Sequence, residues 1–516
     1  MSSRTKNSSR NVLWGLSERL VSIVFPFIVR TVMIYTMGLE YVGLDSLFIS
    51  ILQVLSFAEL GIGSALVFSM YKPFAESKLE KVGALLYLYK RLYVKIGCVI
   101  VLVGLCILPF IKVFISGDVK ADVNIYILYL MYLVNNAISY FLFTYKQSLL
   151  IASQRVDLLN KITLSSKFFL YTLQIVLLVS SHNYYIYVAA IPLSTLVTNY
   201  LVSVVTSKLY SNIECKGEVD QIEINIIKKN VKGMVFQKIG GIVLNSSSSL
   251  VISSFLGLVV LAKFQNYYYI ILALFSILAV ICNSVIPSIG NSVASQTVKE
   301  NYTKFKIFNL LYIWIVSIFL CCLLCLFQPF VKLWIGEDGV LSDDFVILIA
   351  IYFYCHKFCD ILFIYQEACG IWWQTRFTPL ISSIVNLILS LVLIKLLDIN
   401  GVLIATILSV LFVYIPGYSK VLFGTYFKEI KKAQFNFFKT QFILSLVALS
   451  ATLTSYYLCS IVKFESTVVQ LCFNLFVSVV IGNLVLLVFY FNLKDFKSSY
   501  SFFERHFLKK LERSEH

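Results

Sequence analysis

The sequence predicts an all-α protein with about fourteen helices that cross a membrane. Of its 516 residues, 59% are hydrophobic and only 14% are charged, whereas ordinary soluble domains carry about 25% charged residues. Its apolar runs exceed the ~20 residues that a helix needs to cross a bilayer, and they are far too long for barrel strands. The segments between these runs alternate between basic and acidic composition. Together these observations indicate a polytopic membrane protein.

The first predicted helix, over residues 11–37, carries charges inside its apolar run. At 3.6 residues per turn, Arg19, Pro26 and Arg30 (i, i+7, i+11) share one stripe. A charge near the centre of a membrane helix costs about 2.5–3.5 kcal/mol on insertion scales, so such residues usually face a bundle or an aqueous cavity. Snorkelling of the two arginines to the membrane interface is the alternative.

The second predicted helix, over residues 41–70, carries acids instead. Asp45 and Glu59 (i, i+14) fall within about 40° of each other around the helix axis. Two neighbouring helices with one charged face each predict a hydrophilic path through the membrane.

The remaining apolar runs follow at regular intervals. They lie near residues 84–115, 123–150, 161–181, 184–207, 233–256, 261–290, 305–335, 344–370, 377–397, 400–426, 438–460 and 468–491. Two segments outside them, 208–232 and 492–516, place apolar residues among charges and are predicted to lie as amphipathic helices at the inner membrane surface.

The charges between the runs predict the orientation of the chain. Segments on one side hold most of the lysine and arginine, and those on the other side are short and largely acidic. Because cytoplasmic loops collect Lys and Arg, both termini are predicted to be cytoplasmic. The same rule accounts for the net charge of +16, so we expect no nucleic-acid partner.

Enzyme and cofactor signatures are missing from the sequence. The 12 cysteines lie mostly in apolar runs, and no Cys and His spacing fits a zinc site. No Gly-rich phosphate loop with a Lys-Ser/Thr ending occurs. We therefore expect no metal, no cofactor and no enzymatic activity. Energy would come from an ion gradient, another protein or the downhill flow of a substrate.

The two halves of the chain resemble each other at a nearly constant spacing. The matching pairs are 109–118 with 329–338, 145–155 with 365–376, and Gly38–Val42 with Gly257–Leu261. Six predicted helices separate equivalent points, so the halves run in the same direction through the membrane. Parallel repeats of this kind are a known transporter plan, with the substrate site between the halves.

Ionisable residues within the apolar runs are the expected functional groups. An anionic headgroup needs cations in a low-dielectric region, where Arg binds it bidentately and Lys acts as a point charge. Embedded acids suit a coupling ion, either H⁺ or Na⁺. The predicted substrate-binding residues are Arg19, Arg30, Lys90, Lys146 and Lys238, and the predicted ion-coupling residues are Glu59, Asp360 and Glu367.

Structural roles are the alternative for several of these residues. Lys90 could snorkel to the inner interface. Lys357 and Asp360 (i, i+3) could neutralise each other as a structural pair, or His356 and Asp360 (i, i+4) could pair instead.

The opening hairpin resembles a known family. Four short segments are similar to motifs of the bacterial polysaccharide flippases: Arg10-Asn11, Pro26–Arg30, Tyr41–Leu44 and Glu59–Gly63. These proteins belong to the multidrug/oligosaccharidyl-lipid/polysaccharide (MOP) exporter superfamily. The similarity extends over most of the membrane portion, through Gln154-Arg155 and the second-half hairpin.

The resemblance implies two parallel, pseudo-symmetric six-helix bundles that face each other, with two extra C-terminal helices. The predicted divisions are an N-terminal bundle (1–207), a connector (208–232), a C-terminal bundle (233–427), two extra helices (428–491) and a cytoplasmic tail (492–516). It also implies flipping of undecaprenyl-pyrophosphate-linked oligosaccharide repeat units to the outer leaflet of the cell membrane by alternating access, for surface polysaccharide biosynthesis. A cationic central cavity in the family implies a role for Arg30, which lies within the matched motif. The other four cations match no motif, and their roles rest on geometry alone.

Other functions remain open from the sequence. A cation-coupled drug antiporter of the same superfamily should present acids and aromatic residues, whereas basic residues dominate the apolar runs here. A lipid-linked peptidoglycan precursor flippase is another relative. A membrane polysaccharide polymerase, from a different class, generally keeps a large outer loop, and none is predicted. Besides the lipid-linked substrate, membrane lipid and polysaccharide assembly proteins are the expected partners.

Overall fold

The computed structural model describes residues 2–59, 62–117 and 123–491, which are helical over most of their length. Within this part, 11 helices are long and apolar enough to cross a membrane, or up to 12 when one bent pair is counted as a single span. That pair is Ile125–Phe141 with Thr144–Ala152, which meet at 47°. The chain is a multi-pass, all-α membrane protein, as the sequence predicts.

One difference from the predicted fourteen spans lies in the second apolar run. The sequence predicts one helix over residues 41–70, but the structure has α2 (Leu39–Leu55) and α3 (Ile62–Ala75) with a 3₁₀ turn, η1 (Ser56–Glu59), after α2. The prediction of a single continuous helix over residues 41–70 is therefore wrong, because the α-helix is interrupted at η1. Neither α2 nor α3 is long enough to count as a span by itself.

The other difference lies in Trp372–Thr425, which counts as one span of 54 residues. Leu397 and Asp398 inside it have non-helical dihedral angles. This kink separates the two runs predicted at 377–397 and 400–426. When α2 with α3 counts as one span and this stretch as two, the described chain has the predicted fourteen.

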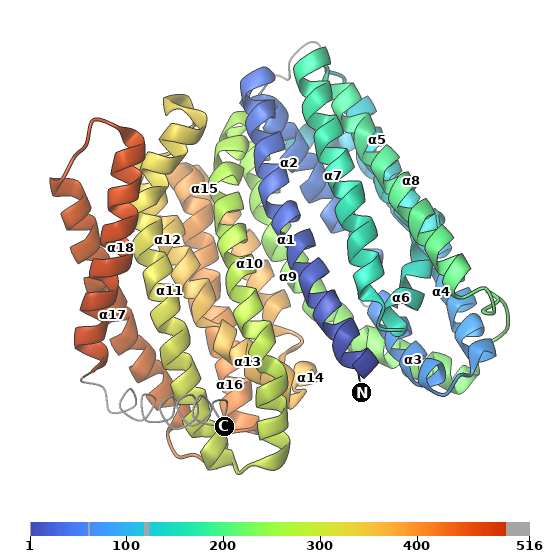
Figure 1. Cartoon of the computed structure of the whole chain (residues 1–516). Helices are drawn as coiled ribbons and strands as arrows, with labels where there is room; N and C mark the ends of the chain where they lie inside the picture. The colour runs from blue at the N-terminus through green and yellow to red at the C-terminus, as the bar shows by residue number, and fades with distance from the viewer. Residues whose placement is uncertain (1, 60–61, 118–122, 492–516) are drawn as a thin grey trace. The chain divides into compact units, whose positions relative to one another are not determined.

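The chain divides into two compact units, Met1–Asn266 and Tyr267–His516. In the first unit α1 packs along α7, α7 packs on α8, and α5 packs on both α4 and α8, while α2 packs on α9 (Figure 1). Besides α2, η1 and α3, its elements are α1 (Ser2–Thr36), α4 (Leu79–Ile107), η2 (Leu108–Phe114), α5 (Ile125–Phe141), η3 (Thr144–Lys146), α6 (Gln147–Ala152), α7 (Val156–Ser181), α8 (Tyr184–Leu209) and α9 (Gln221–Leu256).

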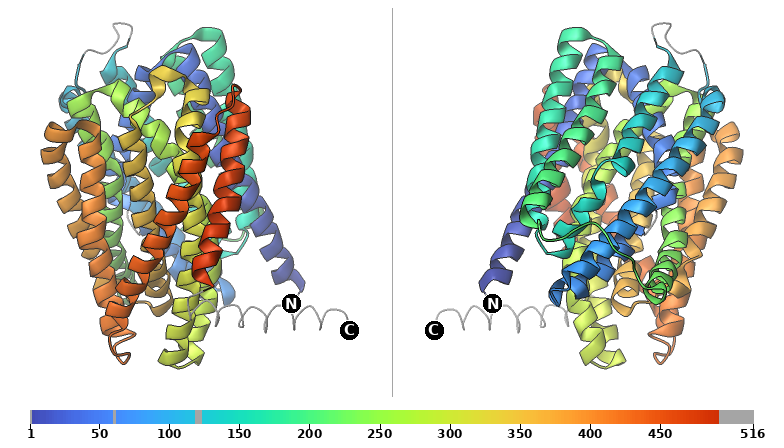
Figure 2. Two further views of the ribbon diagram at one scale, coloured as in Figure 1. Left: turned by 90° about the vertical axis from the view of Figure 1, so that its left-hand side faces the viewer. Right: turned by 90° about the vertical axis from the view of Figure 1, so that its right-hand side faces the viewer.

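In the second unit α11 packs on α12, α17 and α18, and the last two form a hairpin (Figure 2, left). The elements are α10 (Leu258–Ser295, which begins in the first unit), α11 (Val298–Ile335), η4 (Glu337–Gly339), α12 (Asp343–Phe358), α13 (Asp360–Cys369), α14 (Trp372–Thr375), α15 (Thr378–Ser409), the π-helical η5 (Val410–Tyr414), α16 (Ile415–Thr425), α17 (Ala433–Ile461) and α18 (Thr467–Tyr490).

The internal repeat is visible in the backbone. Gly38 precedes α2 with φ 104° and ψ 172°, and Gly257 precedes α10 with φ 85° and ψ 178°. Only glycine adopts such a conformation without strain, because it lacks Cβ. Two glycines in the same rare geometry, at matching positions of the two halves, support the repeat found in the sequence.

The predicted domain boundaries and the cytoplasmic termini stay predictions. Residues 210–220 of the predicted connector are not helical, and α9 begins at Gln221 within it. The predicted tail, 492–516, lies outside the described residues.

The close packing of α2 on the start of α10 makes Gly43 sensitive to substitution. A Cβ at Gly43 would lie 2.2 Å from the backbone oxygen of Leu258. We expect Gly43→Ala to cost about 1–3 kcal/mol, as overpacking generally does. The matched control is Gly241→Ala, because a Cβ at that helical glycine meets no atom within 4 Å. Thermal unfolding of the detergent-purified variants measures the difference, and equal midpoints would contradict the close approach.

Candidate functional site

Arg30 lies in a polar cluster of the first unit, near the turn at Gly38. Its Nε donates a hydrogen bond to Oδ1 of Asn266 on α10, a fully buried side chain. Arg30 is six residues from the end of α1, and Asp45 is six residues from the start of α2. At 1.5 Å per residue, both lie about 9 Å from the helix ends, so they sit at matching depth. The Arg30 charge acts electrostatically on the Asp45 carboxyl.

Asp45 lies beside Arg30, although the predicted site set left it out. Tyr132 on α5 donates its hydroxyl to the Asp45 carboxylate, and the hydroxyls of Tyr132 and Tyr184 are 3.3 Å apart. The Tyr184 ring packs on that of Tyr41 with centroids 5.1 Å apart. The sequence pattern that could have pointed to Asp45 is the helix face that the sequence predicts it to share with Glu59. We call Arg30, Asp45, Tyr132, Tyr184 and Asn266 the arginine cluster.

Glu59 ends the 3₁₀ turn that interrupts the second predicted helix. Its carboxylate accepts hydrogen bonds from the hydroxyls of Tyr93 on α4 and Tyr140 on α5, the latter at 2.8 Å. Tyr89 in turn donates to the Tyr93 hydroxyl at 3.0 Å. The three tyrosines are buried, and Glu59 is half-buried. We call these four residues the glutamate cluster.

The second half of the chain carries a related arrangement. Tyr312 on α11 lies within one residue of the repeat position that matches Tyr93, and it donates its hydroxyl to the carboxylate of Asp360. Asp360 itself stands at the repeat position that matches Tyr140. The repeat therefore keeps the tyrosine on its third helix in both halves. Where the first half has Tyr140, the second half has Asp360.

Asp360 has a cationic partner inside its unit. The Lys357 Nζ lies 2.8 Å from the Asp360 carboxylate, and the two side chains are only 5% and 18% exposed. The Lys357 ammonium also lies 4.2 Å from the ring centroid of Phe275, on which His356 stacks at 4.7 Å. The expected neutralisation of Lys357 and Asp360 by each other is confirmed.

Lys90 and Lys146 are brought together in the first unit. Lys146 ends η3, and its Nζ donates to Ser203 at 2.8 Å and Ser207 at 2.9 Å, both near the end of α8. The Lys90 ammonium is 5.9 Å from the Tyr145 ring centroid, and the two lysine charges act on each other. Because an ammonium has three protons, Lys146 keeps one for a further acceptor. The pair can therefore bind an anion.

Arg19 and Glu367 belong to neither the arginine cluster nor the glutamate cluster. Arg19 is exposed on α1, about 16 Å before Arg30 along the helix. Glu367 is half-buried on α13. The side chain of Lys238 lies outside the described part. Across residues 2–59, 62–117 and 123–491, no group of three or more His, Cys, Asp or Glu side chains is placed to hold a metal ion.

Comparison with known proteins extends this description. No protein-family model matches the sequence, and no curated protein matches it. Among solved structures, the lipid II flippase MurJ in its inward closed conformation aligns with a TM-score of 0.68 and 14% identity, covering 96% of this chain and 100% of that chain. An inward-facing multidrug resistance MATE family transporter of the MOP superfamily gives a TM-score of 0.61 and 13% identity, covering 78% and 96%. A point mutant of the Vibrio cholerae MATE transporter VcmN gives 0.54 and 14%, covering 84% and 100%.

The chain has the fold of the MOP superfamily transporters. The sequence resemblance to this superfamily is thus confirmed for the fold. Identities of 13–14% establish the MOP fold without fixing a substrate. The MurJ alignment covers more of the chain than either MATE alignment does.

The buried ion pair of the second unit can be tested by removing one partner and then both. Lys357→Ala leaves the Asp360 carboxylate buried without its counter-charge, which costs about 3–5 kcal/mol for such pairs. We expect the double variant Lys357→Ala/Asp360→Asn to recover much of that loss in thermal unfolding. Lys72→Ala is the control, because the Lys72–Glu76 pair is exposed and should leave the midpoint unchanged. A double variant no more stable than the single one would show that the pair is not what stabilises this region.

Proposed function

We propose that the protein is a flippase for undecaprenyl-pyrophosphate-linked oligosaccharide repeat units. It would move them from the cytoplasmic to the outer leaflet by alternating access, for surface polysaccharide biosynthesis. The observation that carries this proposal is Arg30, a cation held by buried Asn266 within a membrane bundle of the MOP fold. MurJ, which aligns over its whole length, is described as a lipid II flippase and lends support to a lipid-linked substrate.

The cations of the first unit suit the passage of a pyrophosphate. Moving an unpaired anion into a low-dielectric region costs many kcal/mol, so each stage of the path needs a positive group. Lys90 and Lys146 would receive the pyrophosphate at the end of the unit where α8 ends, which the predicted orientation makes cytoplasmic. Arg30, near the opposite helix ends, would hold it next by bidentate contact. Arg19 and Lys238 remain proposed members of this path.

The coupling ion would bind an embedded acid, for which Glu59, Asp360 and Glu367 are proposed. Glu59 is the strongest of the three, because the hydrogen bonds it accepts come from neutral tyrosines. Those hydroxyls can stay bonded to the carboxyl whether or not it carries a proton. Asp360 instead lies 2.8 Å from the Lys357 ammonium, so its carboxylate already has a cationic partner.

Deletion of the gene tests the function directly. We expect undecaprenyl-linked repeat units to accumulate on the inner leaflet and surface polysaccharide to be lost, because the units can no longer reach the outer leaflet. Analysis of lipid-linked sugars measures the first effect, and staining of surface polysaccharide measures the second. Complementation with Arg30→Ala should restore neither, while the protein still inserts. Arg30→Lys, which keeps the charge but loses the bidentate fork, should restore export in part. Full export by Arg30→Ala would remove Arg30 from the substrate path.

A cation-coupled drug antiporter is the second candidate, and one observation favours it. Asp45 and the tyrosines of the arginine cluster provide the acid and aromatic groups that an organic cation would bind. The same deletion strain separates the two functions. Unchanged polysaccharide together with reduced efflux of cationic dyes would support the antiporter and contradict the flippase.

The coupling role of Glu59 predicts a loss of gradient dependence. Glu59→Gln keeps hydrogen bonding to the tyrosines but cannot exchange a proton. In proteoliposomes, an imposed pH or Na⁺ gradient should accelerate flipping of a lipid-linked oligosaccharide by the wild type and leave Glu59→Gln unaffected. Asp360→Asn and Glu367→Gln in the same assay are the matched comparisons. A wild-type response in Glu59→Gln would exclude Glu59 as the coupling residue.

A further inference from the structure

A cavity of about 810 Å³ lies within the second unit, between α12 and α17, with α11 as its floor. Its volume falls in the range of ~300–1,000 Å³ typical of ligand pockets. Most of its lining is apolar, and its deep end is bridged by a hydrogen bond of 3.2 Å from Ser445 to the Tyr354 hydroxyl. We call this cavity the α12–α17 groove.

The edges of the α12–α17 groove are open at the surface of the unit. Ile347 and Ile351 on α12, and Leu449 and Leu453 on α17, line it with 42–53% of their surface exposed. Because both helices belong to membrane spans, apolar edges of this kind lie at the depth of lipid hydrocarbon. The groove can therefore be filled from the side by a hydrocarbon chain.

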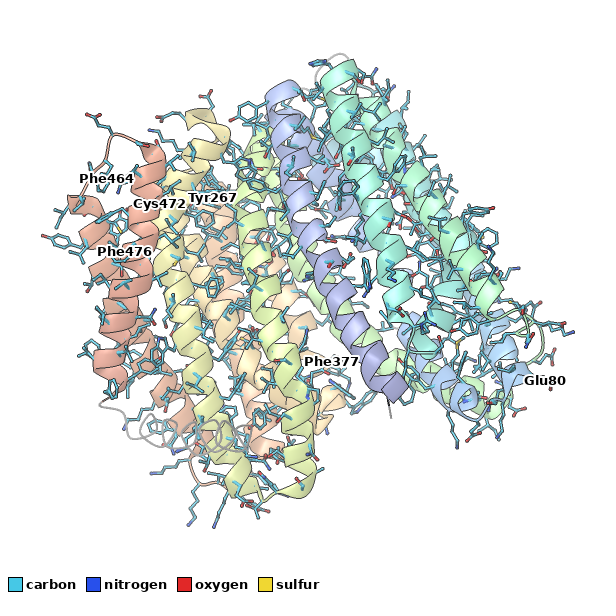
Figure 3. All side chains as sticks on the ribbon, in the orientation of Figure 1. Glu80, Tyr267, Phe377, Phe464, Cys472 and Phe476 are labelled. Carbon is cyan, nitrogen blue, oxygen red and sulfur yellow. The ribbon has the colours of Figure 1, made fainter. Side chains whose placement is uncertain are left out.

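One end of the groove is polar and carries a positive charge on the α17–α18 loop, whose backbone is held by hydrogen bonds. Lys463 lines it, in the loop that joins α17 to α18, where Figure 3 shows the neighbouring Phe464. The Gln470 side chain accepts from the Phe464 backbone N–H at 2.8 Å and donates to the Val462 carbonyl at 3.1 Å. The residues on both sides of Lys463 are thus held in place.

A negative charge lines the same end. Asp343, at the start of α12, accepts a hydrogen bond of 2.9 Å from the Gln328 amide, which also donates to the Leu341 carbonyl at 2.7 Å. The mouth of the groove therefore presents one cation and one carboxylate. This pattern complements a headgroup that itself carries a phosphate and an ammonium.

We propose that the α12–α17 groove binds one molecule of phosphatidylethanolamine from the bilayer. One acyl chain lies between α12 and α17, the phosphate contacts Lys463, and the ammonium donates to Asp343. An anionic headgroup without an ammonium would offer Asp343 no cationic partner beyond its hydrogen bond from Gln328, and would add a repulsive charge. A choline headgroup has no N–H to donate. The bound lipid fills the space between the α17–α18 hairpin and α12, a role independent of the transported substrate.

Native mass spectrometry of the full chain with added phosphatidylethanolamine tests the site. We expect one lipid to be retained per protein, and Lys463→Ala to reduce its retention about tenfold, as expected for loss of one charge-assisted hydrogen bond. Leu453→Trp should also reduce it by filling the groove, since Leu453 is exposed and a larger ring there displaces no packed side chain. Lys332→Ala is the control, because Lys332 pairs with Glu337 on the same end of α11 without lining the groove.

Each other outcome overturns part of the proposal. Equal retention of phosphatidylglycerol or phosphatidylcholine would exclude headgroup selection by Lys463 and Asp343. Unchanged retention in both groove variants, with unfolding midpoints like the wild type, would place the lipid elsewhere. Displacement of the phospholipid by undecaprenyl phosphate would assign the groove to the substrate chain. Failure of the flippase proposal would leave all these readouts unaffected, because none measures transport.

Discussion

A charged side chain inside a membrane bundle must find a partner, and this constraint organises the described structure. An unpaired charge in hydrocarbon costs several kcal/mol, so a folded bundle pairs it with an opposite charge or satisfies it with hydrogen bonds. Both solutions occur here. Lys167 on α7 lies 2.6 Å from Glu18 on α1 and also donates to Ser22, which ties together two helices that pack along their length. Arg30 instead binds the neutral amide of Asn266.

This distinction divides the buried charges into ion pairs and charges that are hydrogen-bonded by neutral groups. An ion pair such as Lys357–Asp360 satisfies both members, so neither is left to recruit a substrate or an ion without breaking the other. A charge bound by neutral groups keeps its net charge, and it attracts an opposite charge whenever one reaches it. In the arginine and glutamate clusters, neutral hydroxyl and amide groups make hydrogen bonds to the charged side chains. Asp45 modifies the first of these clusters, because it places a negative charge beside Arg30. An anionic substrate would have to compete with it.

Much of the fold could be predicted from the sequence because each membrane helix requires a long apolar run, which hydropathy reveals. The apolar runs, their number and the repeat all follow from hydropathy and spacing, and the structure agrees with them. The breaks inside the runs were not predictable in the same way. The 3₁₀ turn at Ser56–Glu59 and the bend before Lys146 lie in apolar stretches without proline, where only tertiary contacts decide whether the helix continues. The stripe of Arg19, Pro26 and Arg30 predicts that both arginines face the bundle, but only Arg30 is partly buried and Arg19 is exposed. The partner of Arg30, Asn266, could not be predicted, because the two residues lie far apart in the sequence.

The repeat shows how two similar halves come to have different chemistry. A tyrosine on α4 and another on α11, one residue apart in the repeat register, each donate to a carboxylate. The carboxylate, however, comes from η1 in the first half and from α13 in the second, where Lys357 accompanies it. A shared framework therefore carries an acid with neutral partners in one half and an acid with a fixed counter-charge in the other.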